Sequence, residues 1–370
     1  MYFIGLTIGH HSSLAIADKN GRIVFAVGEE RFSRKKGHLG SPFESLSQAV
    51  EHLNISNNEL KNSTIVIGTK FSKNDSWFLN LLLDREHQEN YDIFNVGLPP
   101  GLLKSFLDQT RSSGQSQQRL VANAFGFSEE KVHFLNHHDC HASSAFWPSN
   151  FNESLVLTLD GSGDGESGTL SIMSRNSNKE NIYRIPERYS LGHIYSEVTK
   201  RYGFRESKHE GKITGLASYS NKRFAESEFS KLLNCRNGKL GFGWKYLLDP
   251  RNRDRMEMWR YPNHRKAIHL AAQRAESNST AFPDLAAMVQ SYLEKMVIEL
   301  IEQNVDLSKS LSISLAGGVF SNVTLNKKIR DYFGYPIFVF PNMGDGGLSV
   351  GAIWEYMRLN SLTIDEDCVS

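Results

Sequence analysis

Two histidines four residues apart are the first side chains in this sequence that could do chemistry together. His137 and His141 lie in the run NHHDCHASSA at residues 136–145. If the chain is helical from about 137 to 146, both imidazoles leave the same face of the helix, one turn apart. Two neutral imidazoles at this spacing can share one transition-metal ion, although such pairs also occur where a helix is merely capped or packed.

Two aspartates set among glycines could complete such a site. Asp160 follows the apolar run 155–159 and precedes the sequence GSGDG, and Asp345 stands in GDGG after the apolar run 337–340. Glycines permit close backbone approach and positive φ, so that amide N–H groups can point at phosphate oxygens. In both places the alternative is a tight turn made of ordinary turn residues.

A third glycine turn follows another apolar run. Gly317 and Gly318 stand in LAGGVFSN at residues 315–322, where a nucleotide could approach the backbone at the start of a helix. The stretch lacks both the GxGxxG spacing of a dinucleotide site and the GK[ST] of a phosphate loop. A close strand–helix turn without a ligand is therefore the alternative.

Two polar stretches follow the first strands of the chain. His10 stands in GHHSS, where it could act as a base or contact a substrate, or could simply occupy a surface turn. Lys36 ends the charged run EERFSRKK at residues 29–36, and most runs of this kind form a solvated face.

Hydrophobic periodicity and turn residues predict the elements that would position these side chains. An antiparallel meander is predicted from apolar runs and a DKNG turn at residues 2–8, 14–17, 18–21 and 23–27. Ser41 and Pro42 fit the N-cap and the first position of a helix. Further strands are predicted at 64–68, 155–159, 169–173, 312–316 and 337–340, and helices at 283–303 and about 346–358.

The order of a strand, a hairpin and a glycine turn occurs near residue 4 and again near residue 155. This repetition predicts two related lobes, each a mixed sheet flanked by helices. The turn-rich stretch 148–153 would separate an N-terminal lobe, 1–150, from a C-terminal lobe, 151–370, which carries a variable insertion at about 221–280.

Composition narrows the class of protein. Apolar residues make up 39% and charged residues 22% of the 370 positions, which is typical of a folded soluble chain. The net charge of +1 favours neither a nucleic acid nor a membrane as partner. The three cysteines show no CxxC spacing, and the N-terminus lacks a signal peptide, so we expect a cytoplasmic protein that does not contact a membrane.

Taken together and in order, these stretches resemble one family. The sequences HHSS, EERFSRKK, HHDCHASSA, LTLDGSGD, HEGKITGLA, LAGGVFSN and PNMGDGGLSVGA are similar to those of the nodulation-type, tobramycin carbamoyltransferase-like O-carbamoyltransferases. The resemblance runs from residue 2 to about 357. It implies an α/β fold of two ribonuclease-H-like lobes, as in actin, sugar kinases and heat-shock ATPases, with a nucleotide and a metal in the cleft between them.

The resemblance also implies a set of site residues. A single divalent metal ion, iron, would be held by His137, His141, Asp160 and Asp345, a mixed N/O set that suits a transition ion. His10 matches the family histidine suggested to take the proton of the acceptor hydroxyl, and Lys36 matches a basic position facing the carbamoyl or phosphate group. The nucleotide positions implied are Gly161, Gly163, Glu210, Lys212, Gly317, Gly318 and Asn322.

The implied reaction is an O-carbamoylation. Family members make carbamoyladenylate from carbamoyl phosphate and ATP and pass the carbamoyl group to a hydroxyl, with the metal as Lewis acid.

The sequence departs from the family pattern in two places. The family has HD where this chain has His10 and His11, and its second, carbamoyladenylate-forming module would follow about residue 360, whereas this chain stops at Ser370. We therefore expect either a separate protein that supplies the adenylate or a different carbamoyl donor.

We expect the acceptor to bind to residues 244–274, the stretch that we expect to vary most within the family. Residues 244–274 interleave eight basic side chains with four aromatic ones, as a phosphate backbone and unstacked bases require. The hypothesis is a phosphate-bearing acceptor, such as a nucleotide or a hydroxymethylated base in DNA, and the alternative is a solvated face with its aromatics in the core. Other readings of the whole chain are a relative of tRNA threonylcarbamoyl-transfer proteins and a non-catalytic subunit of a two-protein carbamoyltransferase.

Overall fold

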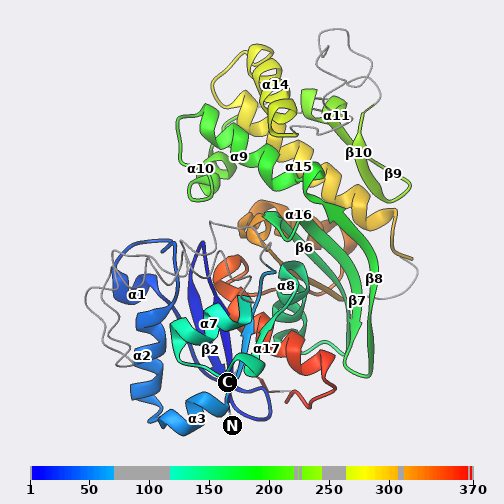
Figure 1. The fold of residues 1–370 in the computed structure, drawn as a ribbon. Helices are drawn as coiled ribbons and strands as arrows, with labels where there is room; N and C mark the ends of the chain where they lie inside the picture. The colour runs from blue at the N-terminus through cyan, green and yellow to red at the C-terminus, as the bar shows by residue number, and fades with distance from the viewer. Residues whose placement is uncertain are drawn as a thin grey trace. The chain divides into compact units, whose positions relative to one another are not determined.

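The computed structural model describes residues 2–70, 117–220, 224, 227–243, 264–306, 312–365, 367 and 368 (Figure 1). The chain divides into two compact units. Unit 1 comprises Met1–Asn150 and Phe340–Ser370, and unit 2 comprises Phe151–Val339. The sequence analysis assigned everything after residue 150 to the second lobe, whereas the residues from Phe340 onward pack in unit 1.

Unit 1 is built on a five-stranded sheet with the order β3-β2-β1-β4-β5. Its strands are β1 Phe3–Thr7, β2 Ser13–Ala17, β3 Ile23–Gly28, β4 Thr64–Ile67 and β5 Val132–Phe134. The first three strands are antiparallel, which confirms the predicted meander, and β1, β4 and β5 are parallel. All residues of β1, β2 and β4 are buried, as expected of strands covered on both faces.

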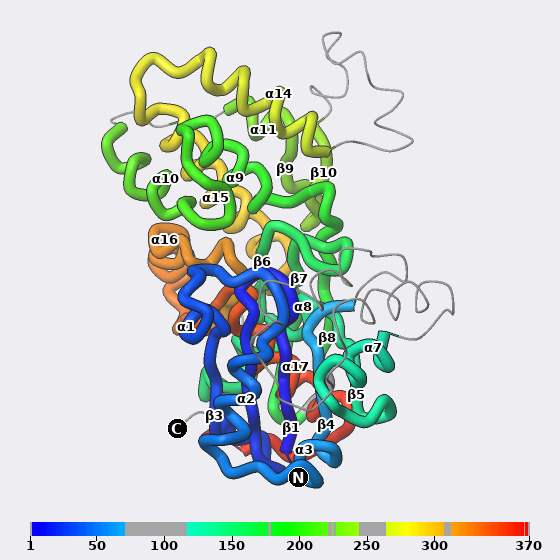
Figure 2. Tube along the Cα trace, turned by 60° about the vertical axis from the view of Figure 1, so that its left-hand side comes forward, coloured from blue at the N-terminus to red at the C-terminus, as the bar shows by residue number. Residues whose placement is uncertain are grey.

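Helices cover both faces of this sheet. They are α1 Glu30–Ser33, α2 Phe43–His52, α3 Asn57–Asn62, α7 Gln117–Phe125, α8 His137–Phe146 and α17 Leu348–Leu359, with short 3₁₀ turns η1 Glu129–Lys131, η2 Trp147–Ser149 and η6 Asp345–Gly347. One core cluster joins strand residues such as Ile4 and Leu14 to Leu46 of α2 and Phe125 of α7. On the other side, α17 packs against β1, β2 and β4 (Figure 2).

The start of α2 differs from the prediction. The helix begins at Phe43 with Pro42 at the N-cap, and no side chain of its own caps it, so the assignment of Ser41 as N-cap was wrong. Glu29, which follows β3, performs this role from a distance. Its carboxylate accepts hydrogen bonds from the amide groups of Glu44 and Ser45, at 3.1 and 2.9 Å, and from the Ser45 hydroxyl. A carboxylate at this end also complements the helix dipole.

Unit 2 repeats the sheet of unit 1, with the order β12-β11-β6-β7-β8. Its strands are β6 Glu153–Gly163, β7 Glu166–Ser174, β8 Ser177–Pro186, β11 Ser312–Ala316 and β12 Ile337–Val339. Strands β6, β7 and β8 are antiparallel and run side by side as long arrows in Figure 1, whereas β6, β11 and β12 are parallel. The shared strand order confirms the predicted pair of ribonuclease-H-like lobes.

The hairpin between β6 and β7 lies later than predicted. Strand β6 continues through Asp160 to Gly163, so Asp160 does not follow the strand but lies within it, at an irregularity of the ladder. The turn itself consists of Asp164 and Gly165, whose φ values are 54° and 81°. Two successive positive φ angles are the mark of a type I′ hairpin turn.

The remaining elements of unit 2 are mostly helical. They are α9 Leu191–Arg201, α10 Glu210–Ala217, α11 Glu228–Leu232, α14 His264–Ser277, α15 Asp284–Glu302 and α16 Val323–Phe333, the 3₁₀ turns η3 Glu187–Tyr189 and η5 Gly318–Ser321, and the hairpin β9 Leu233–Arg236 and β10 Lys239–Phe242. Helix α15 buries the predicted inward residues, among them Met288, Tyr292 and Met296. No helix in the described part of the chain is long and apolar enough to cross a bilayer.

Helices α8 and α17 of unit 1 meet at very short range. A Cβ atom at Gly351 would lie 2.0 Å from the carbonyl oxygen of Cys140, so only a glycine allows the two backbones to come this close. Beside this contact, the buried carboxylate of Glu355 accepts a hydrogen bond from the Ser143 hydroxyl at 2.7 Å. The Arg358 guanidinium donates two more to it, at 2.9 and 2.7 Å.

The substitution Glu355→Ala should lower the free energy of unfolding by about 3 kcal/mol, because it leaves the Arg358 charge and the Ser143 hydroxyl without their partner inside the structure. Urea denaturation would measure the loss. The control is Glu51→Ala on the exposed side of α2, where a change below about 0.5 kcal/mol is expected. Equal effects of the two substitutions would contradict a structural role for the Glu355 carboxylate.

Candidate functional site

Helix α8 carries the two histidines as predicted. Asn136 caps it, because its side-chain oxygen accepts a hydrogen bond from the amide of Asp139 at 3.1 Å. His137 and His141 are both buried, and their ring centroids lie 4.7 Å apart. The predicted helix from about 137 to 146 is therefore confirmed, and it presents both imidazoles on one side.

Asp345 of unit 1 joins this pair from the other end of the chain. Its Oδ1 atom lies 3.6 Å from the Nε2 atom of His137 and 3.6 Å from that of His141. The loop that carries it is fixed on both sides, since Thr7 donates a hydrogen bond to its carbonyl oxygen at 3.3 Å and α17 begins three residues later. The structure thus brings together three of the four residues expected to hold a metal.

The three side chains fit a metal ion. Two atoms bound to one ion at about 2.1 Å each are roughly 3.0 to 3.5 Å apart, close to the distances between Asp345 and the imidazoles. A distance of 3.6 Å is too long for a hydrogen bond, and Asp345 Oδ1 has no hydrogen-bond partner among the described residues. The Thr69 hydroxyl lies 3.5 Å from Nδ1 of His137, where it favours the tautomer with the lone pair on Nε2.

His138 shows which of the three neighbouring histidines does not belong to this set. Its side chain is fully buried, but the possible ligand atoms that lie within 4.8 Å of one another come from His137, His141 and Asp345 of unit 1. One residue of displacement along a helix turns a side chain by about 100°. The His138 ring therefore packs beside the other two, with centroids 5.1 and 6.0 Å away, without adding a nitrogen to the converging atoms.

The loops that carry His10 and Lys36 lie side by side in unit 1. Gly9 and Gly40 exchange two backbone hydrogen bonds, of 2.8 and 3.2 Å, and the amide of Ser12 donates to the carbonyl of His38. Gly9 has a φ of 124°, which favours glycine. The side chains of both His10 and Lys36 are exposed, so that they are accessible to a ligand.

In unit 2, the glycine turn after β11 lies against the end of β6. A Cβ atom at Gly317, whose φ is 99°, would lie 2.2 Å from the carbonyl oxygen of Leu159, and one at Gly318 would lie 3.0 Å from Oδ1 of Asp160. Gly317 is therefore required for the turn to pass beside β6, and a side chain at Gly318 would press on the Asp160 carboxylate. The same carboxylate accepts a hydrogen bond from the Gly161 amide at 2.6 Å. Gly163 lies farther along, where β6 pairs with Glu166.

Two of the predicted nucleotide residues, Glu210 and Asn322, are joined by buried polar contacts. Asn322 caps α16 and donates to the side-chain oxygen of Gln290 at 2.8 Å. The Tyr195 hydroxyl donates to the same oxygen at 2.9 Å and also contacts Thr214, which lies one turn after Glu210 on α10. Burial raises the pKa of Tyr195 well above its ordinary value, so that the phenol stays protonated and remains a donor.

Glu210 and Lys212 face different surroundings. The Glu210 carboxylate accepts hydrogen bonds from the Ser196 hydroxyl at 2.9 Å and from the amide of Ser207 at 2.6 Å. The exposed Lys212 ammonium lies 4.6 Å from the centre of the Phe204 ring, a cation–π contact. The glutamate of the HEGKITGLA stretch is thus fixed by its neighbours, while the lysine lies against an aromatic face.

Several residues at these sites were not anticipated. Tyr195 and Gln290 form the polar network of unit 2, and Glu29 holds the segment that contains Lys36. A signal for Tyr195 was available, because Leu191, Ile194, Tyr195 and Val198 repeat at helical spacing and predict α9. Gln290 had no comparable signal, since a polar residue on a buried helix face reveals its partner only once the fold is known.

Most of the stretch predicted to bind the acceptor, residues 244–274, lies outside the described residues. Its aromatic residues and five of its basic residues fall within 244–263, outside the described residues. The basic residues that the structure does describe, Arg265, Lys266 and Arg274, all lie on α14.

The fold and the site define a protein of two α/β units that share one strand order, with side chains in unit 1 whose ligand atoms converge as in a metal site. The sequence matches a known family over residues 3–354, the family described as carbamoyltransferase N-terminus, and the chain belongs to it. This membership confirms the resemblance that the ordered stretches indicated.

Individual relatives cover the whole chain but are longer than it. The nodulation protein NolNO of Sinorhizobium fredii is 29% identical over 92% of this chain and 45% of its own length. An uncharacterized protein of Synechocystis is 28% identical over 100% of this chain and 60% of its own length. The chain thus spans about half the length of the curated relatives it matches.

Solved structures give weaker likenesses. HypF of T. kodakarensis is 13% identical, with a TM-score of 0.47 over 99% of this chain and 49% of that one. Component A of the (R)-2-hydroxyglutaryl-CoA dehydratase of Acidaminococcus fermentans has the same identity and TM-score, over 97% of this chain and 99% of that one. Identities this low indicate a similar fold and nothing about function. The family assignment therefore rests on the match of residues 3–354 to the family.

The substitutions His137→Ala and Asp345→Ala should each weaken metal binding at least tenfold, because each removes one of the atoms that converge in unit 1. Metal analysis after loading the protein with ferrous iron and dialysing it would measure the retained ion. His52→Ala, an exposed histidine of the same unit, is the matched control and should retain iron like the unaltered protein. Unchanged iron in both test variants would refute the ligand assignment.

Glu29 should make stability depend on pH. Burial raises the pKa of its carboxyl group above the ordinary value of 4.5, although the hydrogen bonds from Ser45 and Glu44 oppose the shift. The folded state therefore holds this proton more tightly than the unfolded chain, and ionisation costs stability as the pH rises from 4.5 through the folded-state pKa.

Relative to Glu29→Gln, the unaltered protein should lose free energy of unfolding as the pH increases across this window. Urea denaturation of both proteins at a series of pH values would measure the difference. Glu51→Gln should follow the unaltered protein throughout. A difference between Glu29→Gln and the unaltered protein that stayed constant, or grew with pH in the opposite sense, would contradict the direction of the shift.

Proposed function

We propose that this chain is the carbamoyl-transferring part of an O-carbamoyltransferase. One observation supports the proposal most directly: in a chain of the carbamoyltransferase N-terminus family, Asp345 approaches His137 and His141 from a distant part of the sequence with a geometry suited to one metal ion. Asp160 of the second lobe is the proposed fourth ligand. It has space for this role because a glycine, Gly318, faces its carboxylate.

Iron(II) is the proposed metal. The ligand set contains two imidazole nitrogens and two carboxylate oxygens, which suits a divalent transition ion better than an oxygen-preferring ion such as magnesium or calcium. When bound, the metal would act as a Lewis acid that polarises the carbamoyl carbonyl and the adjoining phosphate. The two histidines that would bind it are buried, so the metal would be held away from bulk solvent on this side.

The proposed donor is carbamoyladenylate, made from carbamoyl phosphate and ATP. The acceptor hydroxyl oxygen attacks the carbamoyl carbon, a new C–O bond forms, the bond from that carbon to the phosphate oxygen breaks, and AMP leaves. His10 takes the hydroxyl proton, and Lys36 balances charge on the phosphate. Their loops are tied together by the hydrogen bonds between Gly9 and Gly40, which fixes the two roles in one region of unit 1.

The nucleotide is proposed to bind to unit 2. Gly161, Gly317 and Gly318 allow its phosphates to approach the backbone, and the cap of α16 at Asn322 presents free amide groups nearby. Glu210 and Lys212 of α10 would contact the nucleoside. The network through Tyr195 and Gln290 joins α9, α10, α15 and α16, so that these groups would be held in one arrangement before the nucleotide binds.

Because the chain spans about half the length of its relatives, the formation of carbamoyladenylate is assigned to a further module or to a separate protein. The proposed acceptor is a hydroxyl of a small molecule, of a nucleotide, or of the hydroxymethyl group of a modified base in DNA. The basic residues of α14 favour an acceptor that carries phosphate.

Incubation of the iron-loaded protein with carbamoyladenylate and a panel of hydroxyl acceptors should give products heavier by one carbamoyl group, detected by mass spectrometry. The panel would contain nucleotide sugars and 5-hydroxymethyl-2′-deoxyuridine, free and in an oligonucleotide. His10→Ala should lower the rate by about a hundredfold or more, since it removes the general base. Its iron content should not change, and His52→Ala should keep full activity.

A parallel mixture would hold ATP, carbamoyl phosphate and a carbamoyladenylate-forming protein in place of the preformed adenylate. If no acceptor gained a carbamoyl group with either donor system, the proposal would fail. Transfer of a threonylcarbamoyl group to tRNA under the same conditions would instead assign the chain to the tRNA-modifying relatives.

A further inference from the structure

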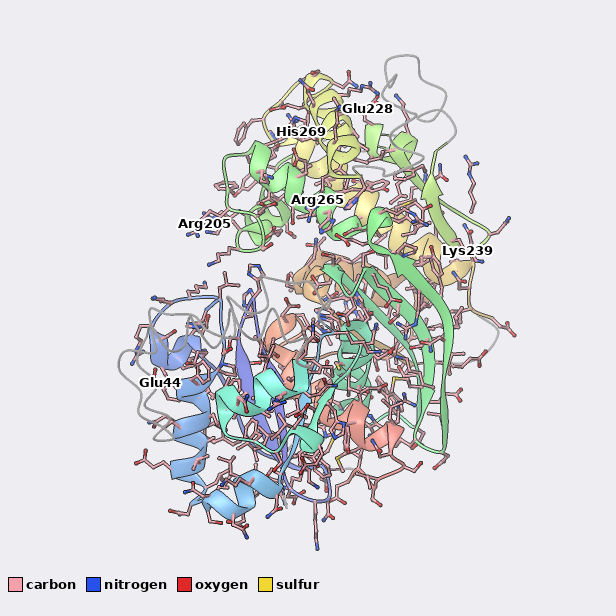
Figure 3. The ribbon with its side chains drawn as sticks, viewed as in Figure 1. Glu44, Arg205, Glu228, Lys239, Arg265 and His269 are labelled. Carbon is pink, nitrogen blue, oxygen red and sulfur yellow. The ribbon has the colours of Figure 1, made fainter. Side chains whose placement is uncertain are left out.

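Arg265 makes an unusual contact in unit 2. It lies in the first turn of α14, and its Nη2 atom is 2.7 Å from Nε2 of His193 on α9 (Figure 3). His193 is 5% exposed, whereas Arg265 is on the surface. No carboxylate of the described residues pairs with this guanidinium. An arginine thus reaches a buried imidazole, and its positive charge is left without a balancing anion.

The contact fixes the proton on the imidazole. A guanidinium can only donate, so Nε2 of His193 must accept, and the ring proton of the neutral histidine sits on Nδ1. Burial, together with the charges of Arg265 and His264, lowers the pKa of His193 to about 3. The imidazole therefore stays neutral at physiological pH. It orients Arg265 but cannot offset its charge.

This pair lies beside the glycine stretch that follows Asp160. A Cβ atom at Gly161 would be 3.4 Å from both Nε2 and Cδ2 of His193, so the edge of the ring that meets Arg265 also faces Gly161. Ser190, the cap of α9, donates a hydrogen bond to the Gly161 carbonyl at 2.7 Å and thereby ties the start of α9 to the same residue. The guanidinium is consequently held next to Gly161, which has no side chain of its own to block a ligand there.

A metal ion is a poorer occupant of this corner than an anion. Glu187, His193 and His264 offer three possible ligand atoms within 4.8 Å of one another. A metal on His193, however, would need the lone pair that Arg265 already engages, or would need the proton to leave Nδ1 while a cation remains at Nε2.

The charges around the start of α14 point the same way. His264, Arg265 and Lys266 are consecutive, and the first turn contains no acidic residue. Basic side chains at the N-terminus of a helix are unfavourable by themselves, because they add to the positive end of the helix dipole. An anion bound by Arg265 would offset this concentration of positive charge.

We infer that Arg265 is a phosphate-binding residue, oriented by His193, and that it contacts a phosphate group of a ligand lying against Gly161. The inference rests on the proposed function, because that function brings two phosphates to unit 2: the one in the nucleotide and the one on a phosphate-bearing acceptor. Both offer the same chemistry, a phosphate dianion or diester that a guanidinium can bind in a bidentate manner. His193 is a positioning residue, since it acts through Arg265.

The test compares ligands that differ only in phosphate. Binding of adenosine and AMP, and of 5-hydroxymethyl-2′-deoxyuridine and its 5′-monophosphate, would be measured by isothermal titration calorimetry with the full iron-loaded chain. Arg265→Gln should weaken the binding of one or both monophosphates about tenfold or more, with the nucleosides unaffected. Arg265→Lys should recover part of the loss, because it restores the charge but not the planar fork. Arg236→Gln, an exposed arginine of β9, is the matched control for net charge and should bind like the unaltered protein.

The pattern of losses identifies the source of the phosphate. A loss confined to AMP assigns Arg265 to the nucleotide, and a loss confined to the deoxyuridine monophosphate assigns it to the acceptor. His193→Leu should reproduce a smaller version of the same loss, again without any effect on the nucleosides. The inference is overturned if the monophosphates bind the unaltered protein no more tightly than the nucleosides, or if Arg265→Gln weakens a nucleoside and its monophosphate equally.

Binding of iron or zinc to a second site that disappears in Glu187→Ala and His193→Leu would also overturn the inference, in favour of a metal at this corner. Failure of the proposed function is a separate result. It would appear as absent carbamoyl transfer in a protein whose discrimination between nucleoside and monophosphate still depended on Arg265.

Discussion

The close crossing of α8 and α17 is the contact on which the candidate metal site of unit 1 depends. Gly351 removes the side chain that would otherwise separate the two backbones, and Gly5 does the same where α17 meets β1, since a Cβ there would lie 1.8 Å from the carbonyl oxygen of Ser349. Close approach at two points leaves α17 no freedom to shift. Asp345, directly before α17, is thereby held at a fixed distance from the histidines of α8.

Unit 2 relies on the same device for a different purpose. Gly317 and Gly168 allow neighbouring backbone to come within contact of β6, where a Cβ would lie 2.2 and 2.3 Å from carbonyl oxygens. These contacts shape the surroundings of Asp160. Buried hydroxyl and amide groups, such as Tyr195 and Gln290, then satisfy one another between the helices. Dense backbone packing and a closed polar network both favour a site that is organised before any ligand arrives.

Much of this arrangement could be predicted from the sequence. The strands of the first meander, β6, β7 and α15 all follow from local periodicity, because their burial depends on spacing within one segment. The presence of two related mixed sheets also followed from the repeated pattern. The start of α2 did not, because the group that caps it, Glu29, is fourteen residues before Phe43, and local rules place the cap beside the helix. The extension of β6 through Asp160 was not predicted either, because the glycines after Asp160 are typical turn residues and only the pairing with β7 keeps them in the strand.

The candidate site divides in the same way. His137 and His141 could be recognised as a pair because a helix brings residues four apart together, whereas their approach by Asp345 is a product of tertiary packing. The resemblance to carbamoyltransferases supplied that partner before the structure did. Neither source indicated that Arg265 reaches His193, because a basic residue in a charged stretch is usually solvated and the sequence holds no mark of the imidazole it meets.

The interrupted path of the chain has a consequence for biosynthesis. Unit 2 is a single continuous segment, Phe151–Val339, whereas unit 1 needs both Met1–Asn150 and Phe340–Ser370. On the ribosome, unit 2 can therefore fold as soon as it has emerged, while the sheet of unit 1 waits with one face uncovered until α17 is made. The histidines of α8 meet Asp345 only at this late stage, so that acquisition of the metal would follow the completion of the fold and could not guide its beginning.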